Sequence, residues 1–345
     1  MRTLLRRTIS YPAVFSFFAR SSFLFERPQL TSALSPRRFT MRRTSVTADQ
    51  YAPYRKHPQL FGDTFQDQWV HPDLKEITQT LPKLSPKLKL ETDEVYSFDC
   101  FTPDFLDLFR EELEHFYKIS EEKNIDVRRP NSMNNYGVVV NEIGMRNLLT
   151  DFQQRYLWPL ANVLFPLESQ GGFDDHHAFI VRYNADEDLG LDMHIDDSDV
   201  TFNVCLGEPG YTGSGLTFCG NFGTSNHRIK TYKYPHQMGR AVFHLGHRRH
   251  GADDIETGTR INLIIWNHSW SYRSSEAYRQ RRHNYVDEAQ APSLECLSYT
   301  HDRDFTHFRA LPKQALEMDH LHPWCPPPGK EYPGYKHSIM SPDEL

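Results

Sequence analysis

Residues 194–206 read His-Ile-Asp-Asp-Ser-Asp-Val-Thr-Phe-Asn-Val-Cys-Leu, and this stretch decides the fold that we predict. From Val200 to Leu206 apolar and polar residues alternate, which predicts a strand with Thr201, Asn203 and Cys205 on its polar face. Before the strand, the side chains of His194 and Asp196 share a face wherever the backbone is extended. We therefore expect a half-buried strand that directly follows a pair of metal-type ligands.

A third ligand and an arginine follow this pair later in the chain. An H-x-D pair is weak evidence alone in a chain with 18 histidines, but two histidines and one carboxylate can occupy one face of an octahedral cation. We predict that His250 joins His194 and Asp196. His244 and His247 precede it at three-residue spacing, which alternates faces on a strand, so we expect no three-histidine cluster and place His247 in a loop.

Arg260 begins another expected strand, where it shares a face with Asn262 and Ile264. An arginine inside a sandwich is costly unless an anion pairs with it, and a carboxylate fits its planar guanidinium. The alternative is an arginine at a strand end that reaches solvent. Beside the predicted metal ligands, the carboxylate anchor is the better interpretation.

Several short apolar runs, separated by glycines, indicate further strands around this stretch. We expect an α+β chain with a double-stranded β-helix (jelly roll) core and supporting N-terminal helices. The apolar spacing predicts those helices over 102–117 and 150–164. The organisation that we predict is a basic leader (1–43), a proline-punctuated extended segment (44–95), a helical support region (96–170), the double-stranded β-helix core (171–270) and an irregular C-terminal extension (271–345).

Composition limits the function classes. The first 43 residues hold nine arginines and a single acidic residue, Glu26, which favours an organelle transit peptide, in first place mitochondrial, or a disordered basic leader. A start at Met41 would give a cytoplasmic form, and the ER lumen is the further alternative. The net charge of −6 argues against nucleic-acid binding, and no apolar stretch is long enough to span a membrane. The five scattered cysteines indicate reduced thiols and favour a reducing compartment.

With the stretch Gly213-Ser-Gly215-Leu-Thr-Phe218 and the spacing of His250 and Arg260, residues 194–206 resemble the 2-oxoglutarate- and Fe(II)-dependent dioxygenases of the prolyl/lysyl hydroxylase type. The run Arg129-Pro-Asn-Ser-Met-Asn-Asn-Tyr-Gly137 is similar to the 2-oxoglutarate and iron-dependent oxygenase domain-containing protein 2 group. The resemblance covers about residues 125–270. Ser214 stands where collagen-type members carry a glycine, which puts their substrate in doubt.

The resemblance implies a dioxygenase that uses O₂ and 2-oxoglutarate to hydroxylate a C–H bond on a protein or peptide side chain, with succinate and CO₂ as co-products. It implies Fe(II) on His194, Asp196 and His250, Arg260 on the distal carboxylate of 2-oxoglutarate, and L-ascorbate as the iron reductant. Tyr183 is a candidate hydroxyl donor to the co-substrate or an ordinary strand tyrosine, and no catalytic residue is expected beyond the metal site. The 129–137 run forms part of the substrate mouth or a loop under the sandwich. A non-catalytic jelly-roll interaction module and a zinc hydrolase with the same triad remain as alternatives.

Overall fold

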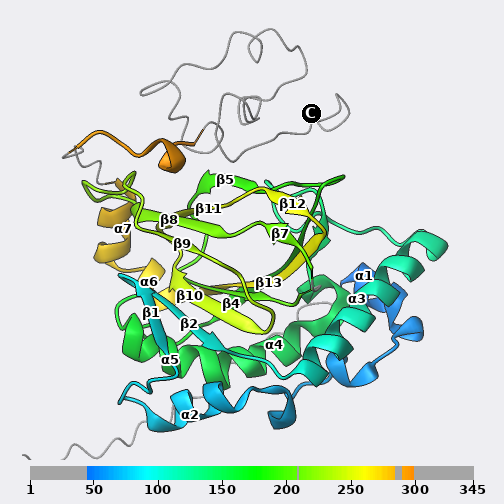
Figure 1. Cartoon of the computed structure of the whole chain (residues 1–345). Coiled ribbons are helices and arrows are strands. Elements are labelled where there is room, and N and C mark those ends of the chain that lie inside the picture. Colours follow the sequence, from blue (N-terminus) through cyan, green and yellow to red (C-terminus); the bar gives the residue numbers. More distant parts are fainter. Residues whose placement is uncertain (1–44, 208–209, 284–289, 299–345) are drawn as a thin grey trace, which may run out of the picture. The chain divides into compact units, whose positions relative to one another are not determined.

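The computed structural model describes residues 45–207, 210–283 and 290–298. Our predictions for the leader and for the chain beyond residue 298 lie outside these residues. Two antiparallel sheets face each other, and helices cover the outer face of the larger sheet (Figure 1). Helices and antiparallel sheets are thus both present, as the sequence predicts. None of the helices in the described ranges has the length and apolarity needed to cross a membrane.

The larger sheet holds strands that are far apart in the sequence. Its order is β1 (Lys89–Thr92), β2 (Val95–Asp99), β10 (Arg240–Leu245), β6 (Val200–Cys205), β13 (Thr259–His268), β4 (Asp175–Asn184) and β3 (Gly137–Val138). The long strands β13 and β4 pair along their whole length, with Arg260 opposite Tyr183 and Trp266 opposite His177. This register places the residues of one face of β13 beside those of β4 and β6.

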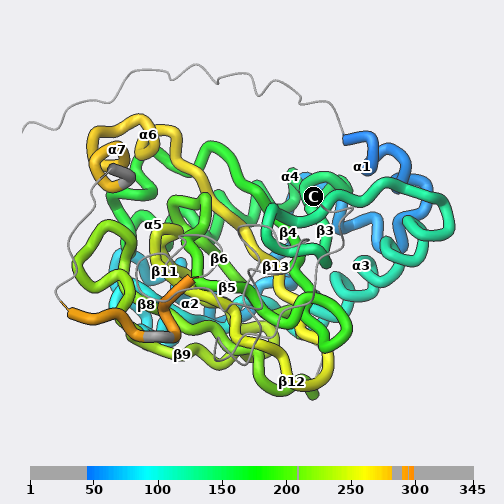
Figure 2. The backbone as a smooth tube through the Cα atoms, turned by 90° about the horizontal axis from the view of Figure 1, so that it is seen from above, coloured from blue at the N-terminus to red at the C-terminus, as the bar shows by residue number. Residues whose placement is uncertain are grey.

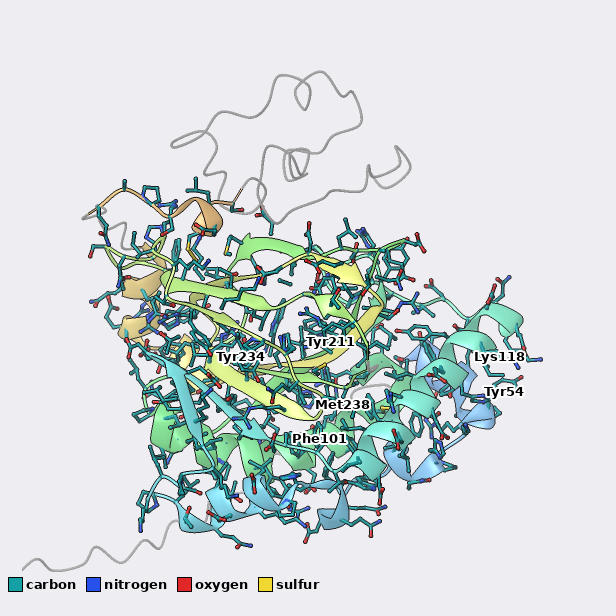
Figure 3. The ribbon with its side chains drawn as sticks, in the orientation of Figure 1. Tyr54, Phe101, Lys118, Tyr211, Tyr234 and Met238 are labelled. Carbon is teal, nitrogen blue, oxygen red and sulfur yellow. A yellow bond between two sulfur atoms is a disulfide. The ribbon has the colours of Figure 1, made fainter. Side chains whose placement is uncertain are left out.

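The smaller sheet lies over the polar face of the larger one. Its order is β5 (Leu191–His194), β11 (Arg248–Ala252), β8 (Leu216–Asn221) and β9 (Tyr232–Tyr234), and β12 (Ile255–Thr257) pairs separately with β7 (Thr212–Gly213). Tyr211 and Tyr234 lie between the two sheets, whereas Phe101 lies between the larger sheet and the helices (Figure 3).

The alternation in β6 separates two environments. Val200, Phe202 and Val204 pack into the core that the larger sheet shares with the helices. The opposite face, with Thr201 and Asn203, lines a pocket between the sheets. The predicted division of this strand is confirmed, but the polar face is enclosed by the second sheet and does not face water. A buried polar face on a central strand marks the site.

The helical layer is formed by α2 (Pro72–Thr80), α3 (Pro103–Lys123), α4 (Arg146–Phe152), the π-helical turns η4 (Asn141–Met145) and η5 (Gln153–Leu157), and α5 (Trp158–Leu164). Both predicted helices are confirmed, although α3 continues to Lys123 and the second is interrupted by η5. Figure 2 shows α6 (Trp270–Arg273) and α7 (Glu276–His283) at one end of the sheets and α1 (Val46–Tyr51) with α3 at the other.

The prediction of an extended segment over 44–95 is wrong. The segment contains α1, the 3₁₀ turns η1 (Ala52–Tyr54), η2 (Pro58–Phe61) and η3 (Asp67–Trp69), α2, β1 and the start of β2. Prolines lie in the first turns of η1, η2 and α2, where a missing N–H is harmless, so here they begin helices. The buried carboxylate of Glu112 on α3 anchors the segment by accepting hydrogen bonds from the Tyr51 hydroxyl and the His57 N–H, each at 2.5 Å.

In the extension after 270, the charged helix expected over 274–285 is confirmed as α7. The described part is nevertheless less irregular than expected, because it also contains α6 and the 3₁₀ turn η6 (Leu294–Cys296). The hydroxyl of Ser269 caps α6 by accepting from the N–H of Tyr272, whose side chain is buried. This local cap and the burial of one aromatic ring are enough to order the short helix.

Two of the cysteines that we expected to be reduced form a disulfide, Cys219–Cys296, between β8 and η6. The two residues are 77 positions apart, and such spacing carries no sequence signal. Arg249 adds a hydrogen bond from its Nε to the carbonyl of Cys296 at 2.7 Å, and Ser298 donates to Asp192 at 3.0 Å. Cysteine usage therefore no longer favours a reducing compartment.

We expect Cys296→Ser to lower the free energy of unfolding by about 4 kcal/mol, because the crosslink closes a long loop and so restricts the unfolded chain. Urea unfolding with and without reductant measures the effect. With reductant the wild type and the variant should unfold at the same urea concentration. A difference that persists in reductant, or the absence of a linked Cys219–Cys296 peptide in mass spectra, would contradict the disulfide.

Candidate metal centre

Two histidines face each other at one position of the smaller sheet. His194 ends β5, His250 lies at the centre of β11, and the strand register pairs them directly. Their ring centroids are 4.4 Å apart, and Asp196 follows in the loop after β5. The Nε2 atoms of His194 and His250 lie 3.3 and 3.7 Å from the two carboxylate oxygens of Asp196. The structure thus brings together the three residues predicted from the sequence.

Both imidazole rings are held through their other nitrogen. The Nδ1 atom of His194 lies 2.8 Å from the backbone carbonyl of Asp192, and that of His250 lies 2.8 Å from the carbonyl of Arg248. A carbonyl only accepts, so each Nδ1 carries a proton, and Nε2 is the nitrogen left to bind a metal. Because these partners are backbone atoms two residues upstream, the strand itself orients the ligands.

Asp196 is fixed through both its carboxylate and its backbone. The Thr201 hydroxyl on β6 donates to its Oδ2 at 2.6 Å, and the backbone N–H of Asp196 donates to the carbonyl of Gly246 at 2.8 Å. Gly246 forms the turn between β10 and β11, and a Cβ there would lie 2.0 Å from the carbonyl oxygen of Ser198. Only glycine permits this close approach, which holds the Asp196 loop against the turn that leads to His250.

The electrostatics suit a cation. Burial lowers the pKa of His250 to about 3, although the nearby Asp196 opposes the shift, so the ring is neutral at pH 7. For Asp196 burial alone would raise the pKa, but His250 and His194 outweigh it and lower the pKa below its usual range. Two imidazoles and one carboxylate are the donor set that a divalent transition metal prefers.

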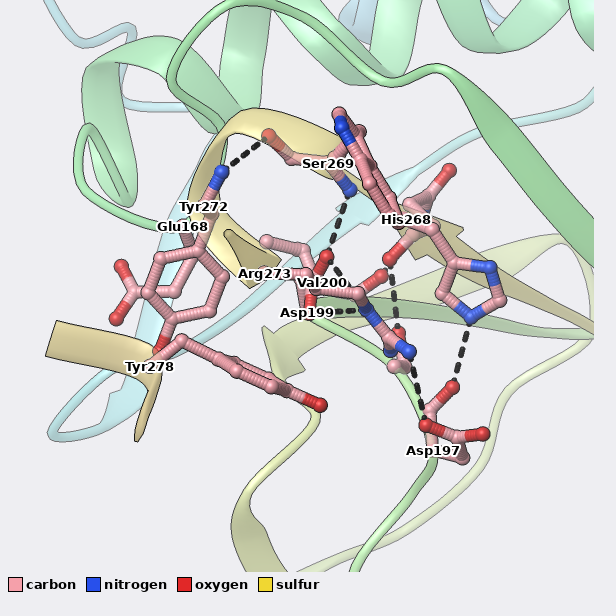
Figure 4. Close-up of polar contacts among 12 residues, drawn as sticks. Glu168, Asp197, Asp199, Val200, His268, Ser269, Tyr272, Arg273 and Tyr278 are labelled. Carbon is pink, nitrogen blue, oxygen red and sulfur yellow. Dashed lines mark hydrogen bonds and ion pairs between the residues drawn. The ribbon is translucent and has the colours of Figure 1, made fainter. Parts of the chain in front are cut away.

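An arginine anchors the loop that carries Asp196 (Figure 4). The Nε of Arg273 on α6 donates to Asp199 at 2.9 Å, its Nη1 lies 3.1 Å from Asp197, and the backbone N–H of Ser269 donates to Asp199 at 2.6 Å. The side chain of Asp197 is exposed, whereas that of Asp199 is buried and paired.

The pocket between the sheets has an empty volume of about 400 Å³, part of it open to solvent. It contains the three candidate ligands and the side chain of Arg260, which is only 1% exposed. The Nη1 of Arg260 donates to the carbonyl of Ser214, its carbon Cζ lies 4.6 Å from the ring centroid of Tyr183, and its Nε has no partner among the described residues. No carboxylate of the described chain pairs with this guanidinium.

Tyr183 lies beside Arg260, and its hydroxyl accepts a hydrogen bond from Nδ2 of Asn134 at 3.3 Å. Asn131 and Asn134 both line the pocket, so the 129–137 run forms part of its wall and is not merely a loop under the sandwich. The full lining is Asn131, Asn134, Phe179, Val181, Tyr183, Leu191, His194, Asp196, Thr201, Asn203, Leu216, His250, Ala252, Arg260, Ile264 and Trp266.

Sequence reasoning did not assign roles to Thr201, Gly246, Arg273 or Asn134. For Thr201 a signal was present, since it lies on the polar face of a predicted strand next to Asp196. The ligand group contains His250 but neither His244 nor His247, although the ring centroids of His244 and His250 are 4.7 Å apart. The two residues lie on different strands, β10 and β11, so a rule for a single strand did not apply. His247 lies in the turn between them, as predicted.

A second group in the described residues, His71, Asp73 and Asp99, also comes close enough to hold a cation, but it is half-exposed. The Nδ1 of His71 caps α2 by accepting from the N–H of Asp73 at 3.2 Å, and Asp99 pairs with Arg240 at 3.2 Å. These contacts explain the group without a metal.

An antiparallel sandwich that encloses two histidines, a carboxylate and a buried arginine is the kind of site found in iron-dependent oxygenases. The comparisons with known proteins agree. A family model described as an OGFOD2-like domain matches residues 48–170. The human "2-oxoglutarate and iron-dependent oxygenase domain-containing protein 2" is 35% identical over 243 residues, which cover 68% of this chain and 67% of that protein. The chain belongs to this family of 2-oxoglutarate- and iron-dependent oxygenases.

Two other relatives match over shorter regions. The "2-oxoglutarate and iron-dependent oxygenase domain-containing protein ICU11" of Arabidopsis thaliana is 36% identical over 191 residues, which cover 54% of this chain and 48% of that protein. Human "Procollagen-lysine,2-oxoglutarate 5-dioxygenase 1" is 31% identical over 183 residues, which cover 50% and 24%. The matched region therefore spans about half of the plant relative and a quarter of the procollagen-lysine enzyme.

We expect His194→Ala and Asp196→Ala each to abolish tight binding of one equivalent of Mn²⁺ or Fe²⁺, because two of three ligands cannot fix a cation in the open site. Metal content after dialysis, together with calorimetric titration, measures this. His71→Ala and Asp73→Asn, which change the half-exposed group, are the matched controls and should keep one equivalent. Loss of metal from the control variants alone would show that the cation binds at the half-exposed group and not at His194, Asp196 and His250.

We expect Arg273→Ala to destabilise the protein by about 3 kcal/mol at pH 8, because it leaves a buried carboxylate unpaired. Burial raises the pKa of Asp199 to about 6, from its usual 3.8, and loss of Arg273 raises this pKa further. The folded state then holds a proton at pH 5 that the unfolded chain lacks, so the unpaired charge is absent there and appears as the pH rises. Urea unfolding should show the smaller loss at pH 5. Equal losses of stability at both pH values would contradict this interpretation. Arg273→Lys keeps the positive charge and should destabilise the protein only slightly.

Proposed function

We propose that this chain is an Fe(II)- and 2-oxoglutarate-dependent dioxygenase that hydroxylates a C–H bond on a protein or peptide side chain and releases succinate and CO₂. One observation carries the proposal. A buried set of two imidazoles and a carboxylate shares a pocket with a buried guanidinium that has no anionic partner in the described chain. The first feature suits a divalent metal, and the second suits the far carboxylate of a dicarboxylic acid.

The residues fit iron by the chemistry and the orientation of the donors. His194, Asp196 and His250 would hold the ion through two Nε2 atoms and a carboxylate oxygen, all within 4.8 Å of one another. Their grouping on one side leaves the pocket side open to co-substrate and O₂. When bound, Fe(II) supplies the redox chemistry that couples reduction of O₂ to decarboxylation of 2-oxoglutarate and to oxidation of the substrate. L-Ascorbate is the reductant that we propose for the iron.

The chain binds and orients the co-substrate. Arg260 pairs with its distal carboxylate, and because its Nη1 is held by the carbonyl of Ser214 and its face by Tyr183, the guanidinium is already positioned before binding. Such preorganisation reduces the entropy lost on binding. Thr201 and the Gly246 turn keep Asp196 in place, so its charge stays beside the histidines.

The strand order supports the predicted double-stranded β-helix. If β4, β5, β6, β8, β9, β10, β11 and β13 are counted in chain order from one to eight, the larger sheet runs 1-8-3-6 and the smaller sheet 2-7-4-5. This alternation between two facing antiparallel sheets is the arrangement of a jelly roll with two Greek keys. It also explains how residues 56 positions apart, His194 and His250, become neighbours.

The proposed substrate class rests on the name of one relative. One relative is named as a procollagen-lysine dioxygenase, which motivates the proposal of a protein or peptide side chain. The two alternatives are addressed by the same pocket. A zinc hydrolase with this triad has no use for a buried unpaired guanidinium beside the metal. A non-catalytic interaction module has no reason to keep both imidazoles oriented toward one point.

We expect the iron-loaded protein to convert 2-oxoglutarate to succinate, even slowly without substrate. A chelator should abolish this turnover, Fe²⁺ should restore it, and Zn²⁺ should not, because zinc has no redox chemistry to offer O₂. Arg260→Lys should raise the KM for 2-oxoglutarate about 30-fold or more, since the fork of two hydrogen bonds is lost from a buried ion pair.

The matched control is Arg240→Lys, because Arg240 lies on a strand of the same sheet but pairs with Asp99 outside the pocket. It should leave the KM unchanged. Hydrolytic activity with Zn²⁺ and no oxygen consumption with Fe²⁺ would replace the proposal with a hydrolase. Binding of a partner that is unaffected by His194→Ala, in a protein without turnover, would favour an interaction module.

A further inference from the structure

An asparagine-rich loop enters the pocket from the edge of the larger sheet. Residues 131–136 read Asn-Ser-Met-Asn-Asn-Tyr and lead into β3. Asn131 and Asn134 line the pocket, and Asn134 is fully buried. The loop is fixed from outside by Asp188, whose Oδ2 accepts from the backbone N–H of Asn135 at 2.7 Å and of Tyr136 at 3.3 Å. The loop is therefore built to hold two amide side chains in defined positions.

The direction of the first amide is determined by the backbone. The side-chain oxygen of Asn131 accepts from the backbone N–H groups of Met133 and Asn134, each at 2.8 Å. A backbone N–H can only donate, so the atom that faces these two groups must be the amide oxygen. The Nδ2 of Asn131 is consequently fixed as a donor that points away from the turn.

This fixed donor determines the direction of the second amide. Nδ2 of Asn131 donates to Oδ1 of Asn134 at 3.0 Å, so the remaining amide nitrogen of Asn134 faces Tyr183 at 3.3 Å. The nitrogen can only donate, which makes the Tyr183 oxygen the acceptor. The proton of the Tyr183 hydroxyl then has no acceptor among the described residues, and it remains available in a pocket that also contains Arg260.

We propose that Asn131 and Asn134 are positioning residues that set the hydrogen-bond direction of Tyr183, so that its hydroxyl donates to a carboxylate bound beside Arg260. The inference rests on the proposed function for the identity of that carboxylate, the distal group of 2-oxoglutarate. The direction itself follows from backbone donors and does not depend on the ligand. The two possible orientations of the Tyr183 hydroxyl are therefore not equivalent, and the hydroxyl acts as a donor toward the ligand.

We call the hydrogen bonds from Asn131 to Asn134 and from Asn134 to Tyr183 the relay. Asn131→Asp reverses the direction of this relay but keeps the two hydrogen bonds from the loop backbone to residue 131. The new carboxylate still accepts both backbone N–H groups, but it presents an oxygen to Asn134. The Asn134 amide must then turn, place its own oxygen toward Tyr183 and take up the Tyr183 proton. We expect the affinity for 2-oxoglutarate to fall about tenfold or more, as far as in Tyr183→Phe, because one hydrogen bond to a charged group is lost. Calorimetry on the Mn²⁺-loaded protein measures binding without turnover.

The controls separate direction from charge. Ser132→Asp adds the same charge at the next residue, whose side chain is exposed, and should change the affinity less than threefold. Asn134→Ala frees the Tyr183 hydroxyl without capturing its proton and should cost less than Asn131→Asp. In a Tyr183→Phe background Asn131→Asp should add nothing beyond the effect of Ser132→Asp. The relay would be overturned if the double variant lost affinity for 2-oxoglutarate by the product of the two single losses. It would also be overturned if Asn131→Asp kept the wild-type affinity.

An infrared difference spectrum of ring-labelled tyrosine, wild type minus Tyr183→Phe, tests the direction without any ligand. The frequency of the Tyr183 C–O stretch should show that its hydroxyl accepts a hydrogen bond in the wild type and donates one in Asn131→Asp. An unchanged band would overturn the relay whatever the ligand is. A shifted band in a protein that does not bind 2-oxoglutarate would instead sustain the relay and contradict the proposed function.

Discussion

The site depends on the pairing of His194 with His250 across β5 and β11, because this single register position brings together two residues that the chain keeps far apart. A slip of one residue would turn one imidazole to the other face of the smaller sheet. The register is held from outside the site. Gly246 lets the β10–β11 turn contact the Asp196 loop, Arg273 ties that loop to α6, and the Cys219–Cys296 disulfide joins β8 to η6.

Much of the site could be predicted because it follows from local periodicity. The alternation in β6 and the inward position of Arg260 need only the period of a strand. Asp196 was predicted by the same rule, but it lies in the loop after β5, where Thr201 and the Gly246 turn hold it beside His194. The approach of His244 to His250 could not be predicted, because the two residues lie on different strands and the period of a single strand does not relate them. The disulfide and the Arg273–Asp199 pair join residues 77 and 74 positions apart, and no local pattern records such contacts. The prolines of 44–95 misled for a related reason, since proline fits both the start of a helix and an extended chain.

The buried polar groups of the pocket have a cost for the folded state that the surrounding layers must offset. Arg260 Nε and Trp266 Nε1 in the pocket wall, and His244 Nε2 beside His250, have no partner among the described residues, and each such buried atom typically costs about 1–3 kcal/mol. Within the described chain, buried polar atoms without a partner also occur away from the pocket, as at Nε of Arg110 and the hydroxyl of Tyr117, so they do not by themselves mark the site. The apolar face of the larger sheet, which packs on α2 to α5, provides the stability that this arrangement needs.

Residues 48–170 and the later part of the chain supply different parts of the site, and the sheet topology explains this division. The region matched by the family model, residues 48–170, contains the helical layer and the Asn131–Asn134 loop, whereas the three candidate metal ligands and Arg260 come later. The helices cover one face of β4, β13 and β6, and the loop reaches the opposite face at the edge where β3 pairs with β4. The same region that buries the apolar face of the sheet therefore also delivers two oriented amides to the polar face. Because those amides are fixed by backbone donors, the loop can specify the direction of Tyr183 without itself contacting a metal ligand.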